Sequence, residues 1–207
     1  MSDLLFVKSF LSSAEQKEIY EQVLRIEPGF YVPTLWSGAR MNLRMNCLGH
    51  HWSSVSYRYT KSRDVDGLDA APVPACLQLL AQRAARATGF WPSEELLPPY
   101  DICIVNWYDE QDGKLGIHAD NSESKSSMTA GYPVVSLSIG ASCVFTLGGL
   151  KRKDPQREYV LDSGDLVLFG RSLRLAYHGV KKILRGTTPP ELGLREPGRL
   201  NLTFRIL

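Results

Sequence analysis

The segment 199–206 alternates strictly between polar and apolar side chains. In an extended strand, successive side chains point to opposite faces. The apolar face would carry Leu200, Leu202, Phe204 and Ile206, and the polar face Arg199, Asn201, Thr203 and Arg205. If this strand lies in a closed double-sheet barrel, its polar face must point to solvent or into a cavity that holds an anion, because two unpaired buried guanidinium groups are costly. A dicarboxylate would satisfy both arginines.

The chain also contains the segment His118-Ala119-Asp120, which is followed later by His178. Two imidazoles and one carboxylate on one face of an octahedral metal ion leave three coordination positions open, enough for a bidentate keto acid and dioxygen. The two arginines downstream can hold that acid's carboxylates. The order of these residues therefore suggests a ferrous-iron oxygenase that uses 2-oxoglutarate. The alternative is three unrelated polar residues near turns.

Composition limits the class of protein without naming a partner. At 207 residues and 43% hydrophobic content, the chain is long enough to enclose a cavity but short for two cores, so we expect one domain over residues 1–207. The net charge of +2 neither requires nor excludes a polyanion. The cysteines are widely spaced, which favours reduced thiols. No segment approaches membrane-spanning length, so we expect a cytoplasmic protein with no membrane partner.

Hydrophobic periodicity divides the chain into a helical part and a strand-rich part. A capping-box pattern at Ser12 or Ser13 predicts a first helix over roughly 13–26. Apolar spacing after residues 72–74 predicts a second helix that ends near Gly89. Period-two patterns predict strands over 102–107, 134–139, 143–147, 159–161, 166–169 and 200–206.

Two segments of this strand-rich part are expected to be long surface loops. Residues 121–131 are polar, and residues 181–198 contain several Gly and Pro residues. The expected fold class is α+β and mainly β, with N-terminal helices that support a double-sheet core.

Several motifs are spread over most of the chain. They are Asn46-Cys47-Leu48-Gly49-His50 with Trp52, Asn106-x-Tyr108, His118-x-Asp120, Gly148-Gly149-Leu150-Lys151-Arg152, Tyr177-His178-Gly179 and Arg199-x-Asn201-x-Thr203-x-Arg205. Together they resemble the AlkB family of Fe(II)- and 2-oxoglutarate-dependent dioxygenases, and its bacterial DNA-repair members in particular. The resemblance implies a double-stranded β-helix, or jelly-roll, core. It implies a catalytic Fe(II) held by His118, Asp120 and His178. It also implies 2-oxoglutarate contacts from Asn106, Tyr108, Arg199, Asn201 and Arg205.

The resemblance further implies an activity. The chain would use Fe(II), 2-oxoglutarate and O2 to remove methyl groups from bases of the 1-methyladenine and 3-methylcytosine type, releasing formaldehyde, succinate and CO2. Single-stranded DNA is the expected partner, RNA is a further one, and we expect a monomer. Three alternatives stay open. They are a related oxygenase acting on tRNA or other RNA, on protein or on a small molecule; a noncatalytic jelly-roll protein that binds zinc or no metal; and an accessory factor that binds lesions without repairing them.

A segment over roughly 40–65 is expected to recognise the nucleotide. It contains Trp52, Tyr57 and Tyr59, and the basic residues interleaved with them or close by are Arg44, Arg58, Lys61 and Arg63. Aromatic faces and cations suit an exposed nucleobase. Arg152, in the basic turn 151–153, resembles a substrate-contacting position. The alternatives are an aromatic hairpin that only covers the core and a basic turn that is only solvated.

Ser122 is a departure from the family pattern. Repair members of the family carry an acid two residues after the metal-binding Asp, where it can read an exocyclic amine, but this chain has Ser122 there. We expect Ser122 to contact the substrate. A hydroxyl can donate or accept, so it reads a base edge less selectively than a carboxylate. Either Glu123 substitutes for the missing acid, or the base preference differs.

Overall fold

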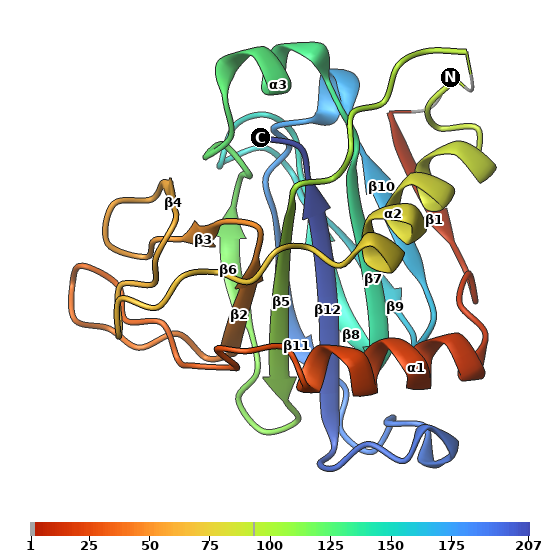
Figure 1. Ribbon diagram of the computed structural model, residues 1–207. Helices are drawn as coiled ribbons and strands as arrows, with labels where there is room; N and C mark the ends of the chain where they lie inside the picture. Colours follow the sequence, from red (N-terminus) through yellow and green to blue (C-terminus); the bar gives the residue numbers. More distant parts are fainter. Residues whose placement is uncertain (1–2, 93) are drawn as a thin grey trace.

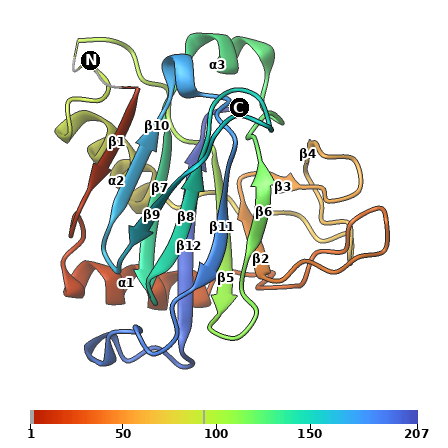
Figure 2. The same ribbon diagram turned by 180° about the vertical axis from the view of Figure 1, so that it is seen from behind.

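Two antiparallel β-sheets face each other in the computed structural model, which describes residues 3–92 and 94–207 (Figure 1). The larger sheet has the order β1 (Leu4–Val7), β10 (Leu166–Phe169), β7 (Val134–Gly140), β12 (Gly198–Arg205), β5 (Ile102–Asp109) and β2 (Arg44–Leu48). The smaller sheet, in front in Figure 2, has the order β6 (Leu115–His118), β11 (His178–Ile183), β8 (Cys143–Leu147) and β9 (Arg157–Leu161). A separate hairpin joins β3 (His51–Trp52) to β4 (Tyr59–Thr60). The expected mainly-β jelly-roll core is confirmed.

Two helices cover the outer face of the larger sheet (Figure 1). They are α1 (Ser13–Leu24) and α2 (Ala75–Ala87). The capping box forms at Ser12 and Glu15 as predicted, and α1 ends two residues before the predicted boundary. Within the described ranges, no helix is long and apolar enough to cross a bilayer.

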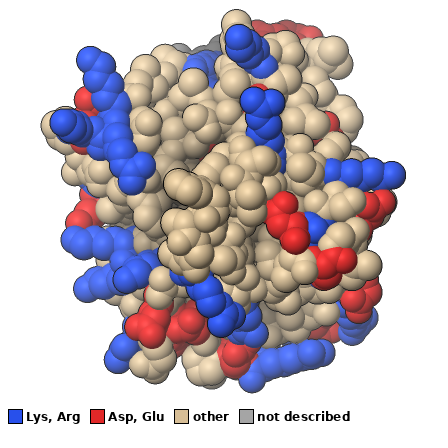
Figure 3. Space-filling model, turned by 90° about the vertical axis from the view of Figure 1, so that its left-hand side faces the viewer, with Lys and Arg blue, Asp and Glu red and all other residues tan. Residues whose placement is uncertain are grey.

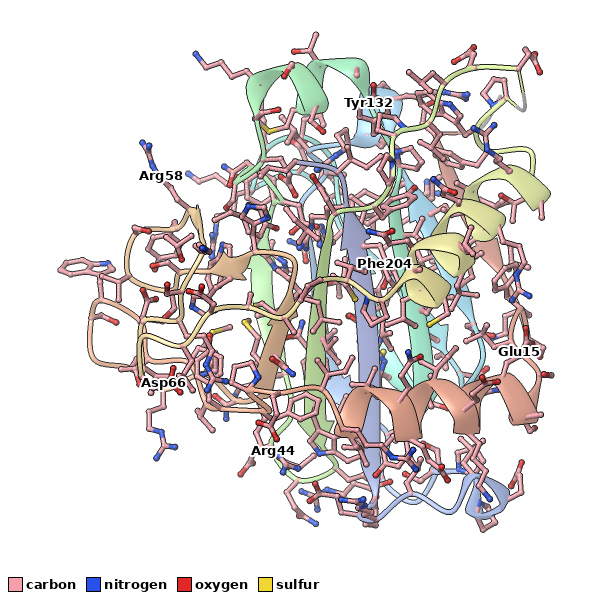
Figure 4. All side chains as sticks on the ribbon, in the orientation of Figure 1. Glu15, Arg44, Arg58, Asp66, Tyr132 and Phe204 are labelled. Carbon is pink, nitrogen blue, oxygen red and sulfur yellow. The ribbon has the colours of Figure 1, made fainter. Side chains whose placement is uncertain are left out.

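Strand β12 separates the two cores. Its apolar side chains pack with those of α1 and α2, and Phe204 lies beneath α2 in Figure 4, edge-on to Tyr100. Its polar side chains face the other way, toward the smaller sheet, where Arg199 lies over the ring of Tyr108. The predicted alternation is therefore confirmed, and the polar face is buried between the sheets.

Two predicted loops contain regular structure. Residues 121–131 include the short helix α3 (Lys125–Ala130), which is capped by Ser124 and ends at the left-handed Gly131. Residues 181–198 begin with the last residues of β11 and include the 3-10 turn Pro190–Leu192. The strands that the sequence did not predict are β1, β2, β3, β4, β6 and β11. They are mostly short, and pairing with neighbouring strands rather than local pattern defines them.

Glu15 gives the fold a pH-dependent contact. The backbone N–H of Ser12, the guanidinium of Arg83 and the hydroxyl of Ser12 lower the pKa of Glu15 to about 2. Because the pKa of Glu15 is lower in the folded protein than its ordinary value, the ionised carboxylate stabilises the fold at pH values above that ordinary value. This stabilisation is lost as the pH falls toward 2. We expect Glu15→Gln to lower the free energy of unfolding by about 0.5 kcal/mol at pH 7, because both groups are partly exposed. Chemical unfolding should show that the difference in the free energy of unfolding between the unchanged protein and Glu15→Gln becomes smaller below pH 4.5. A difference that stays constant with pH would contradict this prediction.

Candidate active site

Three side chains that can hold a metal ion meet beside the smaller sheet. His118 is the last residue of β6, His178 is the first residue of β11, and Asp120 follows β6 closely. His118 and His178 are paired across the two strands, and their rings lie 4.5 Å apart. Nε2 of His118 is 3.6 Å from Oδ1 of Asp120, and Nε2 of His178 is 3.7 Å from Oδ2. Ligand atoms of the three residues lie within 4.8 Å of one another.

Gly179 makes this pairing sterically feasible. The register between β11 and β6 shifts directly after His178. A Cβ at Gly179 would lie 2.7 Å from the carbonyl oxygen of Leu115, closer than the two atoms can approach. A glycine at this position therefore lets the two strands come close enough to set His178 opposite His118.

Backbone carbonyls orient both imidazoles. Nδ1 of His118 is 2.9 Å from the oxygen of Gly116, and Nδ1 of His178 is 2.9 Å from the oxygen of Ala176. Because a carbonyl only accepts, each Nδ1 carries the proton and each Nε2 keeps its lone pair for a metal. Burial, reinforced by the nearby His118, lowers the pKa of His178 to about 4. Two neutral imidazoles and one carboxylate are the donor set of a non-haem ferrous site, so these residues fit Fe(II).

Asp120 is also bonded to β12. Nη2 and Nε of Arg205 lie 2.6 and 2.8 Å from its Oδ2. Burial would raise the pKa of Asp120, but the positive charge of Arg205, followed by the two histidines, holds it below its ordinary value. Asp120 is therefore an anion at neutral pH, as a metal ligand must be. The same contact fixes Arg205 beside the metal ligands.

Arg199 lies deeper between the sheets than Arg205, and two of its hydrogen-bond donors have no partner among the described residues. Its side chain is 1% exposed, and its Nη2 donates to Oγ of Ser138 at 3.0 Å. Its guanidinium lies 5.4 Å from the ring centroid of Tyr108. No described residue accepts from its Nε or Nη1. A buried cation with two unused donors fits a carboxylate ligand, which is the role predicted for it.

The other residues predicted to contact 2-oxoglutarate lie on the neighbouring strands β5 and β12. Asn201 pairs with Asn106, and Arg199 with Tyr108. Asn106 lines the pocket described below, and its Oδ1 has no partner among the described residues. Asn201 is more fully engaged, since its amide donates to Ser136 and Leu137 and accepts from Thr203. Its direct contact with 2-oxoglutarate stays a prediction.

A pocket of about 780 Å³ opens over two of the three metal ligands. Its wall includes His118, Asp120 and Arg205, together with all five residues predicted to contact substrate, which are Trp52, Tyr57, Tyr59, Ser122 and Arg152. Trp52 and Tyr57 meet edge to face, with ring centroids 5.7 Å apart. The β3–β4 hairpin therefore does more than cover the core, because it supplies an aromatic wall to the metal site.

Ser122 holds this hairpin in place. Its hydroxyl accepts from Nε1 of Trp52 at 3.2 Å and donates to the carbonyl of Tyr57 at 3.0 Å. Glu123 does not take the place of the missing acid. Its side chain is 0% exposed and pairs with Arg174 at 3.2 Å and Arg205 at 3.3 Å, so its carboxylate faces the protein interior.

Not all of the basic residues in the expected recognition segment are free of protein partners. Arg63 is 6% exposed, bonds to Asp66 and donates to the carbonyl of Gly29, so this basic residue of the segment is engaged within the protein. Arg44 pairs with Glu196. Arg58, in contrast, points outward from the β3–β4 turn, as Figure 4 shows. The cationic part of the recognition segment is therefore smaller than the sequence suggested.

Sequence reasoning missed the residues behind the site. Arg174 is 3% exposed, and its Nη1 donates to the carbonyl of Asp120 at 2.9 Å. No local pattern distinguishes it in the sequence. Ser136 and Ser138 had a usable signal, because they alternate with apolar residues on β7 just as the polar residues do on β12.

We expect Ser122→Ala to loosen the recognition hairpin. The variant loses two side-chain hydrogen bonds, each worth about 1 kcal/mol. Amide hydrogen exchange at 53–58 should become about tenfold faster or more, since about 1.4 kcal/mol corresponds to a factor of ten. Ser126→Ala, on α3 and outside the pocket wall, is the matched control. Unchanged protection at 53–58 would rule out the restraint.

Comparisons with known proteins place this chain among enzymes of one kind. The sequence profile of the 2OG-Fe(II) oxygenase superfamily matches residues 3–205. The Arabidopsis thaliana protein named DNA N(6)-methyladenine demethylase ALKBH1C is 37% identical and is matched over 98% of this chain and 48% of its own length. The chain thus spans about half the length of that relative.

Two further relatives are matched over most of their length. The alpha-ketoglutarate-dependent dioxygenase AlkB of Escherichia coli is 36% identical, over 81% of this chain and 73% of the AlkB sequence. The solved structure of OsALKBH1 superimposes with a TM-score of 0.87 at 35% identity, covering 100% of this chain and 98% of the other. The superfamily implies Fe(II), 2-oxoglutarate and O2, and the donor set found here fits that metal. The chain therefore belongs to the 2OG-Fe(II) oxygenase superfamily and, within it, to the AlkB family.

Proposed function

We propose that this domain is an oxidative demethylase of N-methylated bases in DNA. One observation carries the proposal: an aromatic-walled pocket opens directly onto two of the three metal ligands, His118 and Asp120. Two Arabidopsis thaliana relatives, each named a DNA N(6)-methyladenine demethylase, support the same class of substrate. We further propose single-stranded DNA as the preferred form, and repair of 1-methyladenine and 3-methylcytosine as the role.

The residues of this chain fit such a reaction. Fe(II) and 2-oxoglutarate, when bound, supply the oxidation of a methyl C–H bond by O2, with 2-oxoglutarate converted to succinate and CO2. His118, Asp120 and His178 would hold the metal, and Arg199 and Arg205 would hold the two carboxylates of 2-oxoglutarate. The hydroxymethyl group produced on the base nitrogen then leaves as formaldehyde, and the unmethylated base remains.

The pocket wall favours a base that is already out of the stack. Unstacking a base from a duplex costs a few kcal/mol, and this cost is least in a single strand. Trp52, Tyr57 and Tyr59 offer apolar faces, and stacking of a base on an aromatic ring contributes about 1 to 3 kcal/mol. Because the hydroxyl of Ser122 is already bonded on both sides, we propose that pocket shape, more than an acid at this position, selects the base.

The decisive experiment is mass measurement of methylated oligonucleotides. Single strands with one 1-methyladenine, 3-methylcytosine or N6-methyladenine are incubated with protein, Fe(II), ascorbate and 2-oxoglutarate, with His118→Ala as the control. The proposal is supported if an oligonucleotide loses one methylene mass and formaldehyde is released with the unchanged protein but not with His118→Ala. The same strands as RNA and as duplex DNA test the choice of nucleic acid.

The other outcomes separate the alternatives. Succinate formation with every oligonucleotide unchanged would move the substrate to a protein or a small molecule while keeping the oxygenase. Binding of methylated strands without succinate or formaldehyde would point to a noncatalytic factor that recognises lesions.

A further inference from the structure

Trp36 is an aromatic side chain that the site described above does not use. It is 74% exposed, whereas Trp91 and Trp107 are 7% and 3% exposed. Single exposed apolar residues are common on protein surfaces, so exposure alone assigns no role. The surroundings of Trp36 must decide whether it has one.

A tight hairpin fixes the position of Trp36. The amide of Leu35 donates to the carbonyl of Ala39 at 2.9 Å, and the amide of Gly38 donates to the carbonyl of Leu35 at 2.8 Å. Gly38 has a φ of +82°, which glycine adopts without strain. Trp36 thus lies at the tip of an ordered turn and not on a loose loop.

This turn lies at the mouth of the pocket. Leu35 and Arg40, on the two sides of the hairpin, both line the pocket. The hydroxyl of Ser54 donates to the carbonyl of Thr34 at 2.8 Å, which ties the hairpin to the turn that carries Tyr57. Tyr57 is itself 48% exposed. The turn that carries Trp36 therefore adjoins the pocket whose wall includes Tyr57.

The charges at the opening suit a polyanion. Arg40, Lys114 and Arg152 line the pocket, and none of them forms an ion pair with any described residue. Figure 3 shows the corresponding side of the molecule, where Lys and Arg side chains surround a largely uncharged centre and several of them lie beside Asp or Glu. An uncharged, aromatic centre with cations beside it matches a single strand, which presents base faces and phosphates together.

We propose that Trp36 is a stacking platform for a nucleobase next to the one that enters the pocket, with phosphates of the same strand on Arg40, Lys114 and Arg152. This inference rests on the proposed function, since it assumes that the pocket takes a base. It assigns to the strand a second contact point outside the pocket. Trp36 would hold a neighbouring base after the target base has left the stack.

The test is a comparison of two oligonucleotides. Both are labelled single strands with one 1-methyladenine, and in one of them the nucleotides on both sides of it are abasic. Fluorescence anisotropy at one fixed salt concentration gives the Kd of each for the unchanged protein, Trp36→Ala and Trp36→Phe, with Leu79→Ala on α2, 65% exposed in the unchanged protein, as the matched control.

We expect Trp36→Ala to raise the Kd of the intact strand about tenfold, within the range of one base–aromatic stack, and to leave the Kd of the abasic strand unchanged. Trp36→Phe should retain most of the affinity, and Leu79→Ala all of it. An equal loss on both strands, or no loss on either, would overturn the proposal. So would absence of binding by the unchanged protein. Because binding is measured without turnover, binding that depends on Trp36 without demethylation would reject the proposed function and keep this inference.

Discussion

Asp120→Asn is expected to reduce Fe(II) affinity and 2-oxoglutarate turnover by more than roughly a hundredfold. Loss of a residue that only orients a ligand costs about 10- to 100-fold, and Asp120 contributes the one anionic ligand atom of the triad. The variant should also be less stable without metal, by about 3 kcal/mol, because Arg205 is 6% exposed and loses the nearer of the two carboxylates that it pairs with. Anaerobic calorimetric titration with Fe(II), and chemical unfolding in the presence of a chelator, measure the two effects.

His118→Ala separates these two roles of the site. His118 is a ligand like Asp120, but its side chain is 33% exposed and it holds no buried arginine. The His118→Ala variant should lose Fe(II) affinity to about the same extent as Asp120→Asn. Without metal, it should keep most of the stability of the unchanged protein. Equal destabilisation by both variants would show that the Asp120–Arg205 contact contributes little to the fold. Retained Fe(II) affinity in Asp120→Asn would remove Asp120 from the ligand set.

The alternation of β12 could be predicted because one strand has to serve two environments. Its apolar residues pack under helices, and its polar residues are buried between the sheets, where Arg205 reaches the pocket. A period of two in the sequence records both demands at once. The long strands of the core were predicted for the same reason. Short strands such as β6 were not, because four residues with a glycine carry little pattern and are defined by their pairing with β11.

The partners of charged side chains were harder to predict than their positions. Trp52 and Arg152 both reach the pocket wall as expected. Arg63 was noted as a basic residue close to the aromatic residues of the recognition segment, but its partner is Asp66, three residues away. Glu123 looked free to read a base, whereas it is buried between two arginines from other elements. Local sequence determines which way a side chain leaves a strand, but it does not determine which nearby charge, local or distant in the chain, becomes its partner.

Arg199→Met is expected to weaken the binding of 2-oxoglutarate and to make the protein without 2-oxoglutarate more stable. The buried guanidinium has two donors without a partner among the described residues, and an unsatisfied buried polar group costs about 1 to 3 kcal/mol. A methionine of similar length removes that cost, so the free energy of unfolding without 2-oxoglutarate should rise by at least about 1 kcal/mol. The KM for 2-oxoglutarate should rise about 10- to 100-fold, because hydrogen bonds to a charged group contribute about 1.5 to 3 kcal/mol.

Together, the two effects predict that Arg199→Met is more stable than the unchanged protein without 2-oxoglutarate and less stable than it with 2-oxoglutarate. With Mn²⁺ in place of Fe²⁺ to prevent turnover, a ligand at a hundred times its Kd adds about 2.7 kcal/mol to the unchanged protein and far less to Arg199→Met. Chemical unfolding with and without 2-oxoglutarate measures both proteins, and Arg25→Met on the exposed end of α1 is the control. If Arg199→Met were stabilised by 2-oxoglutarate as much as the unchanged protein, the carboxylate would have another partner. If the variant were less stable without the ligand, the guanidinium would be a structural group whose contact with Ser138 outweighs its unused donors.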